Sequence, residues 1–222
     1  MSPCWTVLIP MKGLSSAKSR LAAASNGERE HRSLVAAIRA DTLSAAAACE
    51  LVARVVVVRD RPAEPVPGGS APGELDFVQA APGLNAGLSE AATDAAARWP
   101  AEGIVALVGD LPALRADDLD QALRQAATLR RCFVADADGV GTTLLAAAPG
   151  AALQPRFGPD SAARHREIAT ELDATQRLRL DVDTVADLRA AARLGVGPAT
   201  SALLDAAQSP DRHRHDLHLG TA

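Results

Sequence analysis

Short apolar runs of strand length alternate with helical patterns along this chain of 222 residues, and this alternation restricts the fold more than any other feature. The clearest runs are continuous in Val, Ile and Leu, which is typical of strands buried on both faces of a sheet. Such strands require helices above and below the sheet. We expect strands at residues 5–10, 55–58, 76–80, 104–108, 132–135, 142–147 and 177–180.

Helical patterns separate these runs and complete the prediction of fold class. The predicted fold is α/β, a single three-layer domain with a mostly parallel sheet, over residues 1–205. Residues 206–222 are polar and rich in Asp, Arg and His, and we expect them to form a flexible C-terminal tail. Helices are expected at residues 34–47 with Ser33 as the N-cap, and at 85–99, 116–127, 161–171 and 184–194.

Ligands of parallel α/β sheets bind beyond the carboxyl ends of the strands, so loops distant in sequence can be considered together. The loop after the first strand is unusual, because Lys12 and Lys18 are the two lysines of the chain among 23 basic residues. Backbone N–H groups and compact ammonium charges in such a loop favour a phosphorylated ligand. The alternative is a solvated loop that carries two lysines by chance.

Two aspartates follow strand-like runs. Asp110 comes directly after the fourth run and Gly109, where a carboxylate can hold Mg²⁺ on a nucleotide or can simply close the loop before Pro112. Asp181 and Asp183 are two residues apart, on one side of the chain if the strand continues. For Asp183 we consider both a metal ligand and a cap of the following helix.

Neutral donors occur in two further loops. Thr143 follows Gly141 and Thr142, and Ser161 follows Gly158 by three residues. A small phosphorylated acid needs neutral hydroxyl and amide donors as well as cations. Ser161 could instead cap a helix, and the two roles are compatible because an anion can share a helix N-terminus.

Composition excludes several classes of protein. The net charge of −4 and the aromatic content of 2% argue against a nucleic-acid surface. No apolar run reaches the length of a membrane span, and three widely spaced cysteines suggest buried thiols in a reducing compartment. We therefore expect a cytoplasmic protein without nucleic-acid or membrane partners, and the sequence leaves a homodimer open.

These motifs, taken in order, resemble those of the guanylyltransferase family that makes the deazaflavin coenzyme of methanogens and actinobacteria. The resemblance extends from about Trp5 to Leu194. It is carried by the segments at residues 17–21, 83–85, 109–112, 141–143, 156–161 and 181–184. It implies a nucleotide-diphospho-sugar-transferase-like, Rossmann-like domain that transfers GMP from GTP to phosphoenolpyruvate and releases pyrophosphate.

The resemblance also implies roles for individual residues. Thr143, Gly158 and Ser161 would hold phosphoenolpyruvate, and Asp110 and Asp183 would hold Mg²⁺. For GTP we predict Lys12, Gly13, Lys18, Arg20 and Asn85, with Lys18, Lys12 and Asp110 as the catalytic groups. No strong base is required, because the phosphate of the acceptor is already a nucleophile.

Three other readings remain open from the sequence. Archaeal members of the family use 2-phospho-L-lactate as the acceptor. A related transferase could act on a sugar phosphate or a molybdopterin, although the opening loop has one glycine where the molybdopterin branch has a pair. A non-catalytic nucleotide-binding regulator would bind the nucleotide without turnover.

Overall fold

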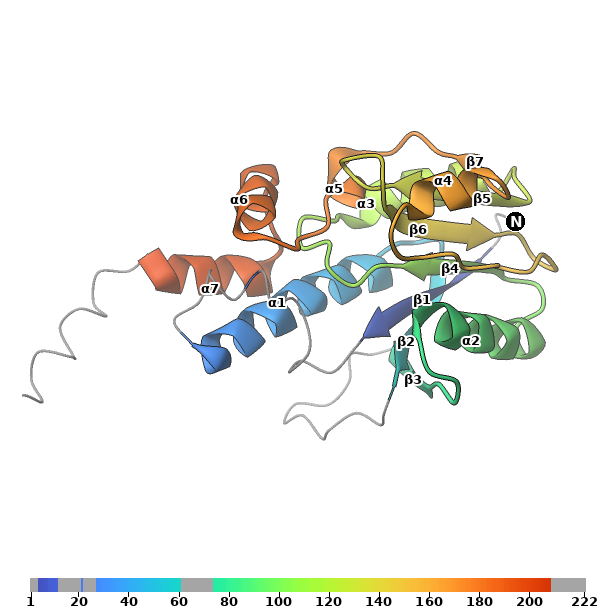
Figure 1. Ribbon diagram of the computed structural model, residues 1–222, viewed down its shortest axis with the longest axis horizontal. Helices are drawn as coiled ribbons and strands as arrows, with labels where there is room; N and C mark the ends of the chain where they lie inside the picture. Colours follow the sequence, from blue (N-terminus) through green and yellow to red (C-terminus); the bar gives the residue numbers. More distant parts are fainter. Residues whose placement is uncertain (1–3, 12–20, 22–26, 61–73, 209–222) are drawn as a thin grey trace, which may run out of the picture.

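The computed structural model describes residues 4–11, 21, 27–60 and 74–208, and within these ranges strands and helices alternate as predicted (Figure 1). The strands are β1 (Trp5–Met11), β2 (Val52–Arg59), β3 (Glu74–Val78), β4 (Gly103–Leu107), β5 (Arg131–Ala135), β6 (Thr142–Ala147) and β7 (Thr170–Glu171). The helices are α1 (Glu28–Ala47), α2 (Leu84–Arg98), α3 (Ala116–Ala126), α4 (Ser161–Arg166), α5 (Gln176–Arg179), α6 (Val185–Leu194) and α7 (Pro198–Gln208).

The seven described strands form one sheet in the order β3-β2-β1-β4-β6-β5-β7. Strands β1 to β4 are mutually parallel, whereas β6 runs antiparallel to both of its neighbours, β4 and β5. The carboxyl end of β4 and the amino end of β6 therefore meet at the same edge of the sheet. The predicted class, a mostly parallel α/β sheet, is confirmed.

Each face of the sheet is covered by helices, which makes the three layers. Alternate residues of β1 face opposite cores: Val7 and Ile9 pack in the cluster that includes Ala46 of α1 and residues of α3. Leu8 packs in the opposite cluster, with the alanine-rich face of α2. The small side chains of α2 allow close packing of this helix on the sheet.

A third core lies past the carboxyl end of β1, where α7 lies beside α1 and α6 stands above these two helices (Figure 1). It joins Leu34 and Ile38 of α1 to Val182 and to Leu188 of α6, all of which are buried. Asp41 of α1 adds a polar link, since its carboxylate accepts hydrogen bonds from the backbone amides of Ala199 (3.0 Å) and Thr200 (2.8 Å) at the start of α7.

Several local predictions were wrong. Residues 177–180 belong to the helical turn α5 and its end, because a four-residue Arg-Leu alternation is too short to distinguish a strand from a turn of helix. Helix α1 begins at Glu28, and the Ser33 hydroxyl bonds the carbonyl of Arg29 one turn earlier. Helix α4 ends at Arg166, before the short strand β7, and α7 was not foreseen.

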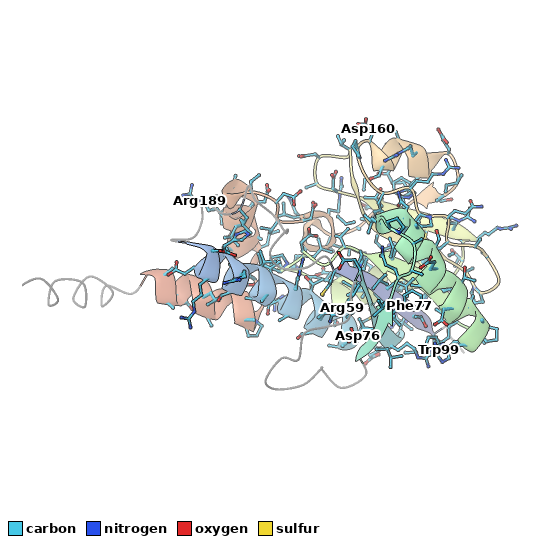
Figure 2. The ribbon with its side chains drawn as sticks, turned by 60° about the horizontal axis from the view of Figure 1, so that its bottom comes forward. Arg59, Asp76, Phe77, Trp99, Asp160 and Arg189 are labelled. Carbon is cyan, nitrogen blue, oxygen red and sulfur yellow. The ribbon has the colours of Figure 1, made fainter. Side chains whose placement is uncertain are left out.

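An ion pair lies at the edge of the sheet, and two of the three cysteines are buried. Arg59 at the end of β2 and Asp76 of β3 form an ion pair at the edge strand, with Arg59 Nε 2.6 Å from Asp76 Oδ1 (Figure 2). Cys49 and Cys132 are buried thiols as expected, whereas Cys4 is exposed. No helix within the described ranges is both long and apolar enough to cross a membrane.

Thr42 links α1 to the loop after β4, and this contact generates a first prediction. Its buried hydroxyl accepts a hydrogen bond from the backbone N–H of Leu111 (3.0 Å) and donates to the carbonyl of Ile38 (3.0 Å). Thr42→Val should lower the free energy of unfolding by about 1–3 kcal/mol, because the Leu111 amide loses its acceptor in a buried place. Urea titration measures this change.

Ser33→Ala is the matched control, because Ser33 makes the same bond to a carbonyl one turn earlier on the same helix but is exposed. That variant should change the free energy by no more than about 0.5 kcal/mol. Equal effects of the two substitutions would show that the bond to Leu111 contributes nothing.

Candidate active site

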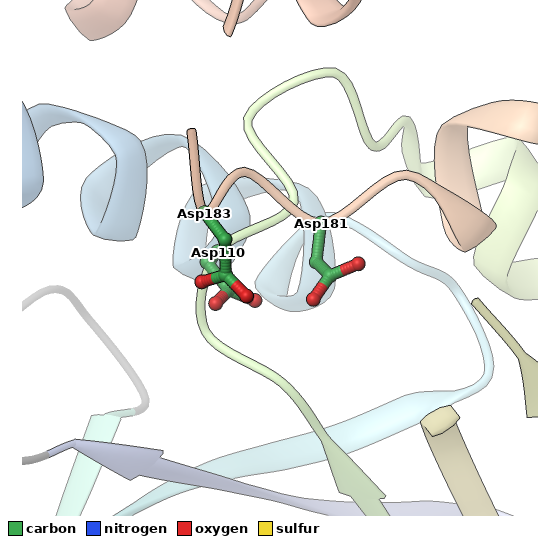
Figure 3. Close-up of side chains that lie close together, drawn as sticks. All are labelled: Asp110, Asp181 and Asp183. Atoms are coloured by element: carbon green, nitrogen blue, oxygen red, sulfur yellow. The ribbon is translucent and has the colours of Figure 1, made fainter. Parts of the chain in front are cut away.

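Three carboxylates converge at the carboxyl edge of the sheet. Asp110 follows β4, and Asp181 and Asp183 come from the segment between α5 and α6 (Figure 3). One oxygen atom from each of the three side chains lies within 4.8 Å of the other two. Asp110 and Asp181 are half-buried, and Asp183 is exposed. The structure therefore brings together the two predicted metal ligands and adds Asp181, which is not among the ligands predicted from the sequence.

A backbone hydrogen bond explains why the two segments meet. The N–H of Val182 donates to the carbonyl of Asp110 over 3.0 Å, so residue 182 is held directly against the loop after β4. The Val182 side chain is fully buried in the third core. Asp181 and Asp183 flank this anchored residue, which brings both carboxylates close to that of Asp110.

Asp183 does not cap α6, because its neighbour Thr184 is the N-cap of that helix. Thr184 is the N-cap of α6: its hydroxyl accepts from the Asp187 amide, and the Asp187 carboxylate accepts from the Thr184 amide over 2.8 Å. This capping box satisfies the start of the helix without the Asp183 side chain. The carboxylate of Asp183 is directed toward Asp110 instead (Figure 3).

The donor set fits a hard divalent cation. Oxygen ligands alone favour Mg²⁺ or Mn²⁺ over metals that prefer sulfur or imidazole. Ligand oxygens of an octahedral Mg²⁺ are about 3 to 4 Å apart, so small side-chain rotations would bring the three carboxylates to one ion. The negative charge of these carboxylates would attract a divalent cation, and such a cation can also bind nucleotide phosphates.

Arg39 of α1 brings positive charge toward the carboxylates. Its guanidinium is half-buried, and burial lowers its pKa, while the charge of the nearby Asp110 opposes that shift and the charge of Arg59 adds to it. No hydrogen bond or ion pair joins Arg39 to another described residue. Nothing in the sequence distinguishes this arginine from the others, because its place near Asp110 depends on the packing of α1.

Thr143 occupies a β-bulge. In the pairing of β5 with β6, Val134 is opposite Leu144 and Ala135 is opposite Thr142, so Thr143 is the extra residue. Its carbonyl accepts from the amide of Val108 (2.9 Å), two residues before Asp110. The side chain is 1% exposed, and its Oγ1 has no hydrogen-bond partner in the described part of the chain. A buried hydroxyl without a partner is costly, and bulges beside binding sites commonly re-aim a side chain.

The segment that carries Gly158 and Ser161 lies against the β5–β6 turn. The amide of Ala162 donates to the carbonyl of Val140 (3.0 Å), and that of Ser161 donates to the carbonyl of Gly158 (3.2 Å). Gly158 has a φ of +118°, which side chains rarely adopt. The N-cap of α4 is Asp160, and Ser161 is the first residue of the helix rather than its cap.

His165 holds this segment from the side of α4. Its Nε2 accepts from the backbone N–H of Arg156 (2.9 Å), so the neutral ring carries its proton on Nδ1, which donates to Thr142 Oγ1 (2.8 Å). The ring is fully buried. Burial, reinforced by the charges of Arg164 and Arg156, lowers the pKa of His165 to about 4.

Among the remaining predicted residues, only Asn85 lies within the described part of the chain. Lys12, Gly13, Lys18 and Arg20 lie outside the described residues, so their predicted roles stay predictions. Asn85 is at the start of α2, and its side chain contacts the backbone of Phe157. Asp110 and Gly158 come from loops, Thr143 is near the start of β6, and Ser161 begins α4, all toward the edge where β4 ends and β6 begins.

Comparison with solved structures identifies the class of this fold. A protein described as a nucleotide-diphospho-sugar transferase of Desulfovibrio desulfuricans has a TM-score of 0.66 at 18% identity and covers 91% of this chain and 94% of its own. A 4-diphosphocytidyl-2C-methyl-D-erythritol synthase of Anaerococcus prevotii has a TM-score of 0.53 at 10% identity, over 91% of this chain and 97% of its own. At these identities the likeness establishes the fold alone.

Sequence comparison identifies the family. The family model "Guanylyl transferase CofC like" matches residues 5–200, so the chain belongs to this family and is an enzyme of the nucleotidyltransferase class. The phosphoenolpyruvate guanylyltransferase of Thermomonospora curvata is 47% identical over 210 residues, which cover 90% of this chain and 88% of the relative. That of Salinispora arenicola is 44% identical over 207 residues, with 91% and 94% covered.

The buried imidazole predicts a pH dependence of stability. The folded pKa of His165, about 4, is below its ordinary value of 6.5, so the unfolded chain binds the proton first as the pH falls. The contribution of the neutral ring is complete above pH 6.5 and is lost between pH 6.5 and about 4, with a slope of up to about 1.4 kcal/mol per pH unit. Urea unfolding at several pH values measures it.

His165→Asn is the comparison variant for this measurement. It should be less stable than the parent at pH 8, but its free energy of unfolding should fall less steeply as the pH decreases below 6.5. Parallel curves for the two proteins would mean that another group causes the acid loss of stability.

Proposed function

We propose that this enzyme transfers GMP from GTP to phosphoenolpyruvate, giving enolpyruvyl-diphospho-guanosine and pyrophosphate, in the cytoplasmic biosynthesis of a deazaflavin coenzyme. The observation that carries the proposal is the arrangement at one sheet edge: a three-carboxylate group beside a buried threonine hydroxyl that lacks a protein partner. The names of relatives that are 47% and 44% identical support the choice of nucleotide and acceptor.

The chemistry matches the residues. The phosphate of the acceptor attacks the α-phosphorus of GTP, and pyrophosphate leaves, so the enzyme must align two anions and stabilise the developing charge. Mg²⁺ bound by Asp110 and Asp183, with Asp181 beside them, would neutralise phosphate charge when present. Lys12, Lys18 and Arg20 are proposed to bind the GTP phosphates, and Gly13 to offer its amide.

Acceptor recognition is assigned to the β6–α4 side of the site. Thr143 would donate its hydroxyl to the phosphorylated acid, and Gly158 and Ser161 would contribute neutral donors. The bulge at Thr143 supports this assignment, because it frees a buried hydroxyl at the edge where Asp110 lies. Neutral donors suit an acid that already brings a phosphate and a carboxylate into a crowded anionic site.

A nucleotide and acceptor panel tests the proposal directly. The enzyme with Mg²⁺ is given GTP, ATP or CTP together with phosphoenolpyruvate, 2-phospho-L-lactate, a sugar phosphate or molybdopterin, and pyrophosphate release is measured. We expect turnover with GTP and phosphoenolpyruvate. Turnover with 2-phospho-L-lactate and not with phosphoenolpyruvate would mean that 2-phospho-L-lactate is the acceptor. Turnover only with a sugar phosphate or molybdopterin would reject the proposal. Nucleotide binding without any turnover would indicate a regulator.

The metal assignment predicts the behaviour of Asp110→Asn. Replacing one carboxylate by an amide should lower kcat at least about 100-fold and raise the Mg²⁺ concentration needed for half-maximal activity. Asp138→Asn is the control, because Asp138 is exposed in the β5–β6 turn. This substitution should leave both kcat and the Mg²⁺ response unchanged. Near-normal activity of Asp110→Asn with an unchanged response to Mg²⁺ would refute the assignment.

The acceptor assignment predicts the behaviour of Thr143→Val. The substitution keeps the volume and removes a hydroxyl that bonds no described residue, so stability should stay the same or increase, while KM for phosphoenolpyruvate rises about 10-fold. KM for GTP should change little. Steady-state kinetics and thermal unfolding measure both effects.

Thr175→Val is a matched control, because Thr175 at the start of α5 also has a buried hydroxyl without a partner in the described part of the chain. It should leave both KM values unchanged. A Thr143 variant that behaves like the Thr175 variant would remove Thr143 from the acceptor site.

A further inference from the structure

Residues 156–158 belong to no helix or strand, yet side chains from two other parts of the fold hold their backbone. The amides of Arg156 and Phe157 and the carbonyl of Phe157 bond to side chains rather than to backbone groups. Irregular segments at a binding edge need such partners, because they have no ladder to satisfy their polar groups. The identity of the partners shows what controls this segment.

The first partner is Asn85, whose side chain pairs with Phe157 at two points. The amide of Phe157 donates to Asn85 Oδ1 over 2.8 Å, and Asn85 Nδ2 donates to the carbonyl of Phe157 over 3.0 Å. One carboxamide thus satisfies both backbone groups of one residue, as a neighbouring strand would. The two bonds together fix the orientation of the peptide units on either side of Phe157.

The second partner is His165, which binds the preceding amide. The N–H of Arg156 donates to His165 Nε2, and the Phe157 ring stands edge-on to the imidazole with a centroid separation of 5.2 Å. Phe157 is 8% exposed and belongs to the core against α2. The backbone and the side chain of Phe157 are therefore both held immediately before Gly158.

The direction of the chain at Gly158 depends on this arrangement. Gly158 has a φ of +118°, and its carbonyl accepts the amide of Ser161, so its peptide units continue directly from the Phe157 peptide that Asn85 holds. A rotation of that peptide would redirect both Gly158 and the start of α4. Asn85 itself is the second residue of α2, directly after the loop that follows β3.

We propose that Asn85 is a positioning residue for the acceptor site. Asn85 orients Phe157 and Gly158, which affect binding of the phosphorylated acid, and it makes no contact with GTP. This inference rests on the proposed function, because Gly158 and Ser161 are there assigned to the acceptor. It also replaces the role in GTP binding that the sequence alone suggested for Asn85. The polar groups of the side chain that would face a nucleotide are instead used by the Phe157 backbone.

Asn85→Ala tests the inference by its effect on the two substrates. Loss of the paired hydrogen bonds should raise KM for phosphoenolpyruvate about 10-fold and leave KM for GTP within about twofold, because only the acceptor segment loses its support. Thr93→Ala is the control: Thr93 is exposed on α2 two turns later, and its hydroxyl bonds the carbonyl of Ser89. It should change neither constant.

A second readout does not depend on activity. In the parent protein the Phe157 amide should exchange slowly with solvent hydrogen, and in Asn85→Ala it should exchange at least about 10-fold faster, because its acceptor is gone. Asn85→Asp, which has the same shape and keeps an acceptor for this amide but loses the donor to the carbonyl, should keep the slow exchange and still raise the acceptor KM. This variant also serves if Asn85→Ala fails to fold.

The outcomes separate this inference from the proposed function. If the parent enzyme transfers GMP to phosphoenolpyruvate and the Asn85 variants raise KM for GTP alone, Asn85 binds the nucleotide and the inference is wrong. Unchanged acceptor KM with unchanged Phe157 exchange would also overturn it. Absence of transfer in the parent enzyme would instead overturn the proposed function, and the acceptor role of Asn85 with it.

Discussion

The hydrogen bond from the Val182 amide to the Asp110 carbonyl is the contact on which the site depends. It joins the end of β4 to a segment more than 70 residues later, and burial of the Val182 side chain holds that contact in place. Without it the Asp181 and Asp183 carboxylates would have no reason to approach Asp110, since like charges repel. The backbone hydrogen bond and the burial of Val182 therefore hold three carboxylates together, although their mutual repulsion alone would separate them.

The same principle governs the acceptor side of the sheet edge. The chain there is irregular, and side chains supply the hydrogen bonds that a strand or helix would otherwise provide. His165 and Asn85 hold residues 156 and 157, and the Asp136 carboxylate accepts the amides of Val140 (2.9 Å) and Gly141 (2.7 Å) in the turn before Thr143. A Cβ on Gly141 would lie 2.3 Å from that carboxylate, so a larger residue at this position would displace the Asp136 side chain. Its amide is already used within the protein.

Prediction from sequence succeeded where a pattern was long and failed where it was short. The continuous apolar runs of β1, β2 and β4 and the long repeats of α2 and α3 were recognised because burial of a whole strand or helix face leaves a clear period. The four-residue alternation at 177–180 predicts a strand, although these residues form a helical turn and its C-cap. Thr184, not Asp183, caps α6, which only the hydrogen-bond geometry could decide.

The sequence by itself determined the α/β class, the family and the conclusion that Asp110 stands at the end of a buried strand. These follow from local periodicity and from ordered motifs, which are properties of neighbouring residues. Only the tertiary structure decided that Asp181 joins Asp110, that the charge of Arg39 lies near Asp110, and that Asn85 bonds Phe157. Each of these depends on contacts between segments far apart in the chain, because the packing of helices and the register of strands set distances that sequence spacing does not contain.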